Sequence, residues 1–195
     1  MNEDDLQPPP ALLDGLLTRS RELGFQGWSW PQVGALLRTM AATKPGGKLL
    51  EIGTGTGVGT CWLLDGMDRD ARLITAETDS VRHSIARSFL EGDSRVTLLL
   101  EDGRQTIARQ SPSSLDLIFA DGGVGKHELL DETLALLKPG GIYICDDTKP
   151  HPLWPPEHAV KIPKLMTALS SRKDFRRVYL DYSSGVVIMA RSTLG

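Results

Sequence analysis

Three glycines alternate with threonines in a short stretch that could hold a nucleotide. Gly53, Gly55 and Gly57 follow a run of apolar residues and precede a stretch with helical character. Glycine permits a tight turn and lets a ligand approach the backbone, and a helix start beyond the turn offers free amides. A turn that needs only left-handed backbone would not require so regular a spacing. The stretch therefore predicts a nucleotide-binding turn at the carboxyl end of a buried strand.

The glycine spacing differs from two common nucleotide motifs. The dinucleotide fingerprint G-x-G-x-x-G would need a glycine at position 58 or 60, where valine and threonine stand. The phosphate-binding loop G-x-x-x-x-G-K-S/T also fails, because no glycine stands at position 120 and Lys126 is followed by histidine. The turn is therefore not typical of a nicotinamide-dependent oxidoreductase or of a P-loop enzyme.

An acidic residue stands where a ribose would be bound. Glu77 closes the next predicted strand, 24 residues beyond Gly53. In nucleotide-binding βαβ units a carboxylate at this distance accepts hydrogen bonds from the ribose hydroxyls. A lone solvated charge at a strand end is common, but together with the glycine turn Glu77 favours a ribose contact.

The elements that must position these residues follow from the alternation of β-rich and helical stretches. Nearly continuous apolar strands separated by helices predict a doubly wound α/β sheet of parallel strands with helices on both faces. The predicted strands are 48–52, 72–77, 96–101, 115–120 and 142–145, and the predicted helices between them are 58–66, 80–92, 104–108 and 127–137.

The two ends of the chain complete the predicted domain. Strands at 175–180 and 185–190 have so short a link that they can only pair antiparallel, and a helix ending near residue 172 precedes them. The first part of the chain predicts a disordered lead-in over residues 1–9 and helices at 11–23 and 30–42. We expect one domain over residues 10–195, with its Rossmann-like core at 47–191.

Composition limits the class of protein. The chain has 195 residues, a formal net charge of −3 and two cysteines. Such a balance offers no basic patch for nucleic acid or an anionic membrane, and two cysteines suit a reducing cytoplasm. No apolar run is long enough to span a bilayer. We expect a cytoplasmic, single-domain protein without nucleic-acid or membrane partners.

Three segments together resemble class I S-adenosylmethionine-dependent methyltransferases. They are Leu-Glu-Ile-Gly-Thr-Gly-Thr-Gly at 50–57, Leu-Asp-Leu-Ile-Phe-Ala-Asp at 115–121, and Leu-Leu-Lys-Pro-Gly-Gly-Ile-Tyr-Ile-Cys-Asp-Asp at 136–147. The resemblance is to the O-methyltransferase group related to catechol and caffeoyl-coenzyme A methyltransferases. It implies a seven-stranded, mostly parallel Rossmann-like sheet with an antiparallel C-terminal strand, in agreement with the hairpin inferred from the residues.

The resemblance also implies how S-adenosylmethionine would be held. The glycine turn would hold the methionine portion, Glu77 the ribose, and the Asp102-Gly103 pair at the end of the third predicted strand the adenine. The expected cofactor-binding residues are Glu51, Gly53, Thr54, Gly55, Gly57, Glu77, Asp102, Gly103 and Asp121.

A divalent metal site is a further implication. Metal-dependent members carry an Asp after the fourth strand and an Asp-Asn pair after the fifth, which match Asp121, Asp146 and Asp147 here, with Asp147 in place of the Asn. Oxygen ligands suit Mg²⁺ or another hard divalent cation. The alternative is that Asp146 and Asp147 support the cofactor pocket or cap a loop.

The catalytic base is the least constrained prediction. Metal-dependent relatives have a lysine after the fourth-strand Asp, and Lys126 with Asp121 is the matching pair, although the glycine-rich segment 122–125 is longer than the usual spacing. Lys126 could instead be a solvated residue at a helix start. His151 could act as a base without metal, and Trp154 could line the acceptor pocket.

The sequence thus predicts methyl transfer from S-adenosylmethionine to a hydroxyl oxygen of a small molecule, by a chain that can form a homodimer. A non-catalytic cofactor-binding module is the first alternative, and a nicotinamide-dependent oxidoreductase is the second. Trp28 and Trp30 precede a helix that covers the cofactor in this family, so they either cap the site or anchor the helix.

Overall fold

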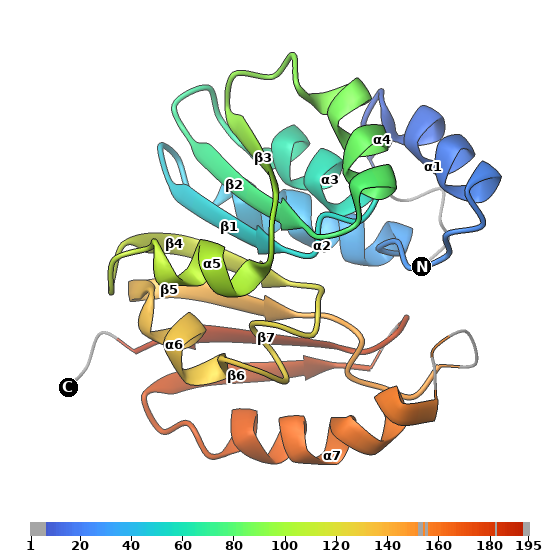
Figure 1. Ribbon diagram of the computed structural model, residues 1–195. Coiled ribbons are helices and arrows are strands. Elements are labelled where there is room, and N and C mark those ends of the chain that lie inside the picture. The colour runs from blue at the N-terminus through green and yellow to red at the C-terminus, as the bar shows by residue number, and fades with distance from the viewer. Residues whose placement is uncertain (1–6, 152–153, 155, 182, 193–195) are drawn as a thin grey trace.

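A seven-stranded sheet forms the centre of the molecule in the computed structural model, which describes residues 7–151, 154, 156–181 and 183–192. The strand order is β3-β2-β1-β4-β5-β7-β6 (Figure 1). The strands are β1 Lys48–Ile52, β2 Arg72–Glu77, β3 Val96–Leu100, β4 Leu115–Ala120, β5 Leu137–Cys145, β6 Phe175–Leu180 and β7 Val186–Arg191. The helices are α1 Leu13–Glu22, α2 Pro31–Ala42, α3 Val58–Gly66, α4 Ser80–Leu90, α5 Gly103–Ala108, α6 Leu130–Ala135 and α7 Pro156–Ser170.

The pairing of the strands confirms the predicted topology. Strands β1 to β5 pair in parallel, whereas β7 runs antiparallel to both β5 and β6. The order reverses beside β1, since β2 lies on one side of it and β4 on the other. In open α/β sheets this switch point, at the carboxyl ends of the strands, is where ligands bind.

Alternate side chains of each central strand enter two different cores. Leu49 and Leu117 pack with α1, α2, α3 and the end of α4, whereas Leu50 and Ile118 pack with α5, α6 and α7. Such alternation follows from the two-residue period of a strand. Because both faces are covered, the central strands are mostly apolar, as the sequence indicated.

The predicted first residue of the fifth strand was wrong. Strand β5 begins at Leu137 instead of 142, and α6 is confined to Leu130–Ala135 instead of 127–137. Leu115 pairs with Leu137 but Leu117 pairs with Ile142, so β5 has extra residues that bulge out between these pairs. The bulge contains Gly140 at φ +76°. Proline and glycine in this segment hid the strand from sequence reasoning.

Other boundaries differ by a few residues at most, and some predictions lie outside the described residues. Most of the predicted lead-in at 1–9 lies outside them, but the carbonyl oxygens of Gln7 and Pro8 accept hydrogen bonds from Arg38 of α2. Cys61 and Cys145 are both buried and unpaired. Within the described ranges, no helix has the length and apolar character needed to cross a membrane.

Candidate functional site

The glycine turn leaves the carboxyl end of β1 and enters α3 directly. All three glycines have positive φ: +100° at Gly53, +55° at Gly55 and +96° at Gly57. Residues with side chains rarely adopt such backbone, so the alternate glycines follow from the turn's geometry. A Cβ on Gly53 would lie 2.8 Å from the backbone nitrogen of Gly122, because the ends of β1 and β4 approach closely here.

Two predicted binding residues lie beneath the turn and position it. Glu51 is completely buried, and its Oε2 accepts a hydrogen bond from the Thr75 hydroxyl at 2.6 Å. The Thr75 hydroxyl is in turn 2.6 Å from that of Thr54. Burial raises the pKa of Glu51 to about 7. Glu51, Thr54 and Gly57 therefore shape the turn from below, whereas Gly53 and Gly55 line the cleft above it.

Glu77 connects the end of β2 to the glycine turn. Its Oε2 accepts the N–H of Gly55 at 2.8 Å, and its Oε1 accepts the backbone N–H groups of Thr78 and Asp79. The guanidinium of Arg82 lies 3.1 Å from the same Oε1. The carboxylate is thus held in one orientation at the floor of the cleft, at the position the sequence predicted for a ribose contact.

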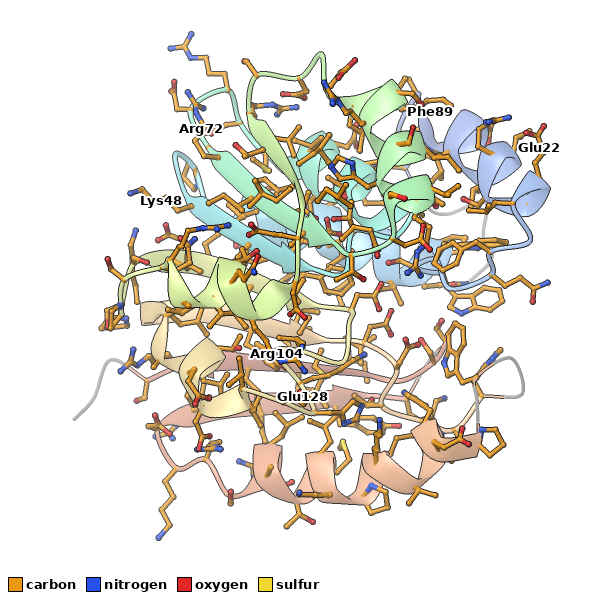
Figure 2. All side chains as sticks on the ribbon, in the orientation of Figure 1. Glu22, Lys48, Arg72, Phe89, Arg104 and Glu128 are labelled. Carbon is orange, nitrogen blue, oxygen red and sulfur yellow. The ribbon has the colours of Figure 1, made fainter. Side chains whose placement is uncertain are left out.

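Asp102 and Gly103 begin α5 at the end of β3. Asp102 caps the helix by accepting the backbone N–H of Arg104 at 2.8 Å, and it pairs with the Arg104 guanidinium at 2.7 Å. These contacts, the backbone hydrogen bond first, lower the pKa of Asp102. Arg104 also pairs with Glu128, so it joins α5 to the segment before α6 (Figure 2). Both Asp102 and Gly103 line the cleft.

One cleft of about 650 Å³ runs from the glycine turn to α7 and is lined by Gly53, Gly55, Glu77, Asp102 and Gly103 among others. Several of its walls carried no sequence signal. Phe25 covers Gly55, since a Cβ there would meet the Phe25 ring at 3.2 Å, and Arg82 lies 5.2 Å above the centre of that ring. His127 and Lys161 face the cleft from the other end. Phe25, Arg82, His127 and Lys161 come from four segments that are far apart in the chain, which explains why no local motif revealed them.

The far end of the cleft contains a buried lysine among carboxylates. Lys126 is only 4% exposed; its Nζ donates to the carbonyl oxygen of Asp146 at 3.0 Å and lies 3.9 Å from Oδ2 of Asp147. The alternative of a solvated Lys126 is therefore wrong. Burial and the neighbouring carboxylates of Asp147 and Asp146 raise the pKa of Asp121 well above its usual value, and burial raises that of Asp146 to about 6.

The charge state of Lys126 follows from the same neighbours. Burial by itself would lower its pKa, but Cys145, Asp147, Asp121 and Asp146 outweigh burial and raise the pKa above its ordinary value. The side chain is therefore an ammonium at neutral pH. An ammonium has no lone pair, so in this arrangement Lys126 supplies positive charge and N–H donors.

The glycine-rich segment after β4 turns the chain so that Lys126 points inward. Gly125 has φ +87°, and its N–H donates to the carbonyl oxygen of Glu128 at 2.7 Å. The hydroxyl of the fully buried Tyr143 donates to the Gly125 carbonyl oxygen at 2.8 Å. The His127 N–H donates to Gly123. The long glycine-rich segment 122–125 therefore gives the chain the path that buries Lys126.

The three aspartates predicted to bind metal do not form a cation cage. Oδ1 of Asp146 already accepts the Ser184 hydroxyl at 2.7 Å and the Asp147 N–H at 2.7 Å. Oδ1 of Asp147 accepts the indole N–H of Trp154 at 3.1 Å, and its Oδ2 faces Lys126. Within the described part of the chain, no group of three or more His, Cys, Asp or Glu side chains could hold a metal ion. With the Lys126 ammonium among them, these aspartates therefore do not fit a divalent cation.

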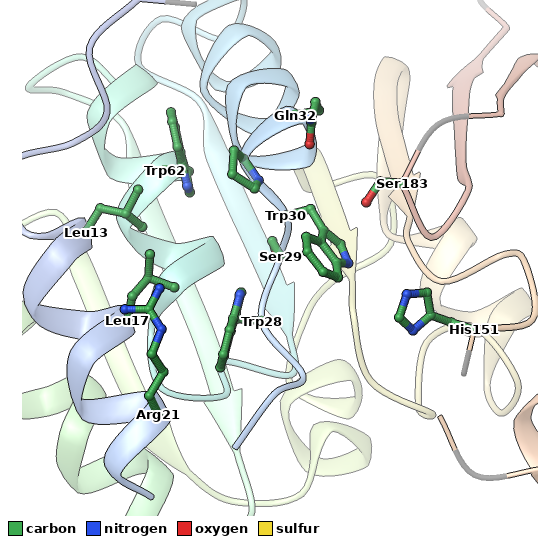
Figure 3. A pocket seen from close by; sticks show the side chains of 11 residues that line it. Leu13, Leu17, Arg21, Trp28, Ser29, Trp30, Gln32, Trp62, His151 and Ser183 are labelled. Carbon is green, nitrogen blue, oxygen red and sulfur yellow. The ribbon is translucent and has the colours of Figure 1, made fainter. Parts of the chain in front are cut away.

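Aromatic rings connect the lysine end of the cleft with a second cavity of about 610 Å³. Figure 3 shows Trp30 and His151 facing one another across that cavity, with Trp28 on its other side. Five rings form a series that ends beside Lys126: Trp30, His151, Trp154, His158 and His127. The centres of successive rings are 5.9 Å, 5.5 Å, 6.5 Å and 6.0 Å apart. Trp154 lines the first cleft, whereas Trp28 and Trp30 line the second cavity just before α2. That they cap a bound cofactor stays a prediction.

Comparison with known proteins places most of these features within one family domain. A family model described as a methyltransferase domain matches residues 50–148, which include the glycine turn and Lys126. A protein of Mycobacterium sp. (strain JLS) named "Putative O-methyltransferase" is 33% identical over 139 residues, covering 67% of this chain. The chain spans 63% of the length of that relative.

Solved structures with the same fold include two that hold the methyl donor or its product. An O-methyltransferase from Bacillus cereus in complex with SAH has a TM-score of 0.82 at 22% identity, over 97% of this chain and 94% of that one. The O-methyltransferase TomG from Streptomyces achromogenes in complex with SAM has a TM-score of 0.83 at 20% identity, over 97% and 93%. At such identities the likeness shows that the whole described fold is shared.

Proposed function

Because this chain belongs to the methyltransferase-domain family, we propose that it binds S-adenosylmethionine and transfers the methyl group to a hydroxyl oxygen of a small molecule. One observation carries the proposal. The glycine turn with Glu77, and the end of the cleft with Lys126 and Asp147, line the same cavity. A donor at one end and an acceptor at the other would therefore meet within it.

The residues at the turn suit the donor. Gly55 leaves room for a ligand beside the backbone, with Phe25 as the nearest side chain. Glu77 can accept hydrogen bonds from ribose hydroxyls once they replace the loop N–H groups that it now accepts. Asp102, Gly103 and Asp121 line the same cleft, and we expect the first two to contact the adenine. Glu51, Thr54 and Gly57 act on the cofactor through the shape of the turn.

The chemistry asks the protein for alignment and for removal of a proton. S-adenosylmethionine supplies a methyl group on a sulfonium, so an O–CH₃ bond forms while the C–S bond breaks and leaves its electron pair on sulfur. The walls of the cleft would align donor and acceptor for this displacement. Lys126 stabilises negative charge on the acceptor oxygen. Burial lowers the pKa of His127 to about 4, so its ring is neutral at pH 7. Its buried Nε2 has no partner among the described residues and can accept a hydrogen bond from the acceptor hydroxyl, whose proton is released to solvent as the O–CH₃ bond forms.

The aromatic series supports an aromatic acceptor. Rings at spacings of 5.5 to 6.5 Å lead from the second cavity to Lys126. A planar phenol or catechol can stack on such rings while its hydroxyl lies beside the ammonium. The relatives' name of O-methyltransferase agrees with an oxygen acceptor.

Calorimetry followed by a transfer assay tests the proposal. We expect S-adenosylhomocysteine to bind the purified chain at one site and NAD not to bind. Transfer of isotopically labelled methyl from S-adenosylmethionine to phenols and catechols is then measured, with the corresponding methyl ethers as non-acceptor controls. Binding of NAD without S-adenosylhomocysteine would refute the proposal. Binding of S-adenosylhomocysteine without transfer to any hydroxyl compound would favour a non-catalytic module.

A further inference from the structure

The Lys126 ammonium lies among the side chains that a divalent cation would need. It donates to the main chain of Asp146, faces the carboxylate of Asp147, and interacts electrostatically with Asp121. We propose that Lys126 takes the place of the divalent cation in this chain, and that the acceptor oxygen is held and stabilised by the ammonium without metal. This inference rests on the proposed methyl transfer.

The balance of charge explains why one cation suffices and a second is disfavoured. Three carboxylates gather at the ends of β4 and β5, and a buried carboxylate without compensation is costly. Asp121 and Asp146 are buried beside the Lys126 side chain, of which 3% is exposed. The ammonium cannot diffuse away, since the backbone bonds of its loop hold it. A divalent ion entering beside it would be repelled by a positive charge a few ångströms away.

Two departures from the metal-dependent pattern are explained together by this role. The long segment 122–125 brings Lys126 into the site, where Gly125 at φ +87° and its bond from Tyr143 fix the turn. Asp147 stands where those relatives have Asn, and it is the carboxylate that faces the ammonium at 3.9 Å. An extra negative charge is of little use beside a well-liganded metal, but it is a suitable partner for a lysine.

The ammonium also has donors left for a ligand. Its nitrogen carries three protons, and the described structure gives it one hydrogen bond, to the Asp146 carbonyl oxygen. Lys126 borders the cleft beside Asp147 and Trp154. An oxyanion in the cleft could accept the remaining N–H groups. The metal's usual tasks, orienting the oxygen and stabilising its charge, then fall to one side chain.

Binding of Mn²⁺, measured by calorimetry on the intact chain, tests the inference independently of activity. The wild type and the control Lys161→Ala, which removes another lysine bordering the same cleft, should not bind Mn²⁺ measurably. Lys126→Ala removes the resident cation and leaves the carboxylates, so it should gain Mn²⁺ binding that the wild type and Lys161→Ala lack. EDTA should not change S-adenosylhomocysteine affinity or the transfer rate of the wild type.

Each outcome decides the matter. Binding of one Mn²⁺ per chain by the wild type would overturn the inference, and so would a folded Lys126→Ala that gains none. If Lys126→Ala fails to fold, Lys126→Met retains the side-chain length without the charge and carries the same expectation. If neither variant folds, the wild-type result decides: no Mn²⁺ binding supports the inference. Failure of the proposed function is seen separately, as absence of S-adenosylhomocysteine binding to the wild type.

Discussion

Replacing Gly53 by alanine would test whether the close approach of β1 and β4 holds the cleft together. Its backbone has φ +100°, which costs a residue with a Cβ about 1–2 kcal/mol. The new Cβ would also lie 2.8 Å from the Gly122 nitrogen and 3.0 Å from the Asp121 carbonyl carbon. Both atoms are backbone, so no side-chain rotation relieves the contact, and overpacking of this kind costs about 1–3 kcal/mol.

The expected loss of unfolding free energy is therefore about 2–5 kcal/mol for Gly53→Ala. For a chain of this length that corresponds to a melting temperature lowered by roughly 4–20 °C. Urea unfolding, followed by tryptophan fluorescence, measures the free energy directly. Calorimetry on the same variant should show weakened S-adenosylhomocysteine binding, because displacing the end of β4 would move Asp121, which lines the cleft.

Two matched glycines separate the two costs. Gly140 has φ +76° but nothing within 4 Å of a Cβ, so Gly140→Ala should lose only the backbone part, about 1–2 kcal/mol. Gly92 has neither a positive φ nor a neighbour within 4 Å, so Gly92→Ala should be unchanged. If Gly53→Ala were no less stable than Gly140→Ala, the contact with Gly122 would not be rigid, and the reasoning would be refuted.

Three further predictions concern other parts of the molecule. Glu77→Gln keeps the shape of the side chain but removes its charge. Because hydrogen bonds to charged groups contribute about 1.5–3 kcal/mol, the affinity for S-adenosylhomocysteine, measured by calorimetry, should fall roughly 10–150-fold. An unchanged affinity would exclude a ribose contact. Gly34→Ala places a Cβ 2.3 Å from the Trp62 indole and should cost about 1–3 kcal/mol in urea, with altered tryptophan emission; a wild-type midpoint would contradict this packing. Because burial raises the pKa of Glu51 from 4.5 to about 7, the folded chain binds this proton more tightly than the unfolded chain, and stability should decline by about 3 kcal/mol as pH rises between these two values. Glu51→Gln should lack that decline when urea midpoints are compared across the window, and an equal decline in both proteins would assign it to another group.

Local sequence predicted the parallel sheet and its antiparallel hairpin well. Alternation of apolar and polar positions along a strand, and glycines where φ must be positive, are properties of neighbouring residues, so they can be read along the chain. Gly53, Gly55 and Gly57 all have left-handed backbone, which glycine permits in the tight turn that the sequence predicted. The antiparallel pairing of β6 and β7 followed from the length of their connection. The start of β5 was missed because its bulge contains the residues that usually end strands.

The candidate site was only partly accessible in this way. Glu77, Asp102 and Asp121 end successive strands, and parallel strands carry their ends to one edge, so their assembly was predictable. Phe25 and Arg82 reach the cleft from separate segments, without a motif. The distinction between Glu51 beneath the turn and Gly55 above it depends on which face of the sheet each borders, and spacing alone did not reveal it.

Local backbone preference and strand ends can be recognised along the chain, so the residues alone indicated a glycine turn, a doubly wound sheet and a set of carboxylates at one edge. What compensates those carboxylates became apparent from the folded arrangement. Whether Lys126 lies in solvent or inside depends on the path of the chain from Gly122 to Gly125 and on the Tyr143 hydroxyl that holds it from another strand. Charge compensation is a property of distances in space, and the buried ammonium was visible only once those distances were known.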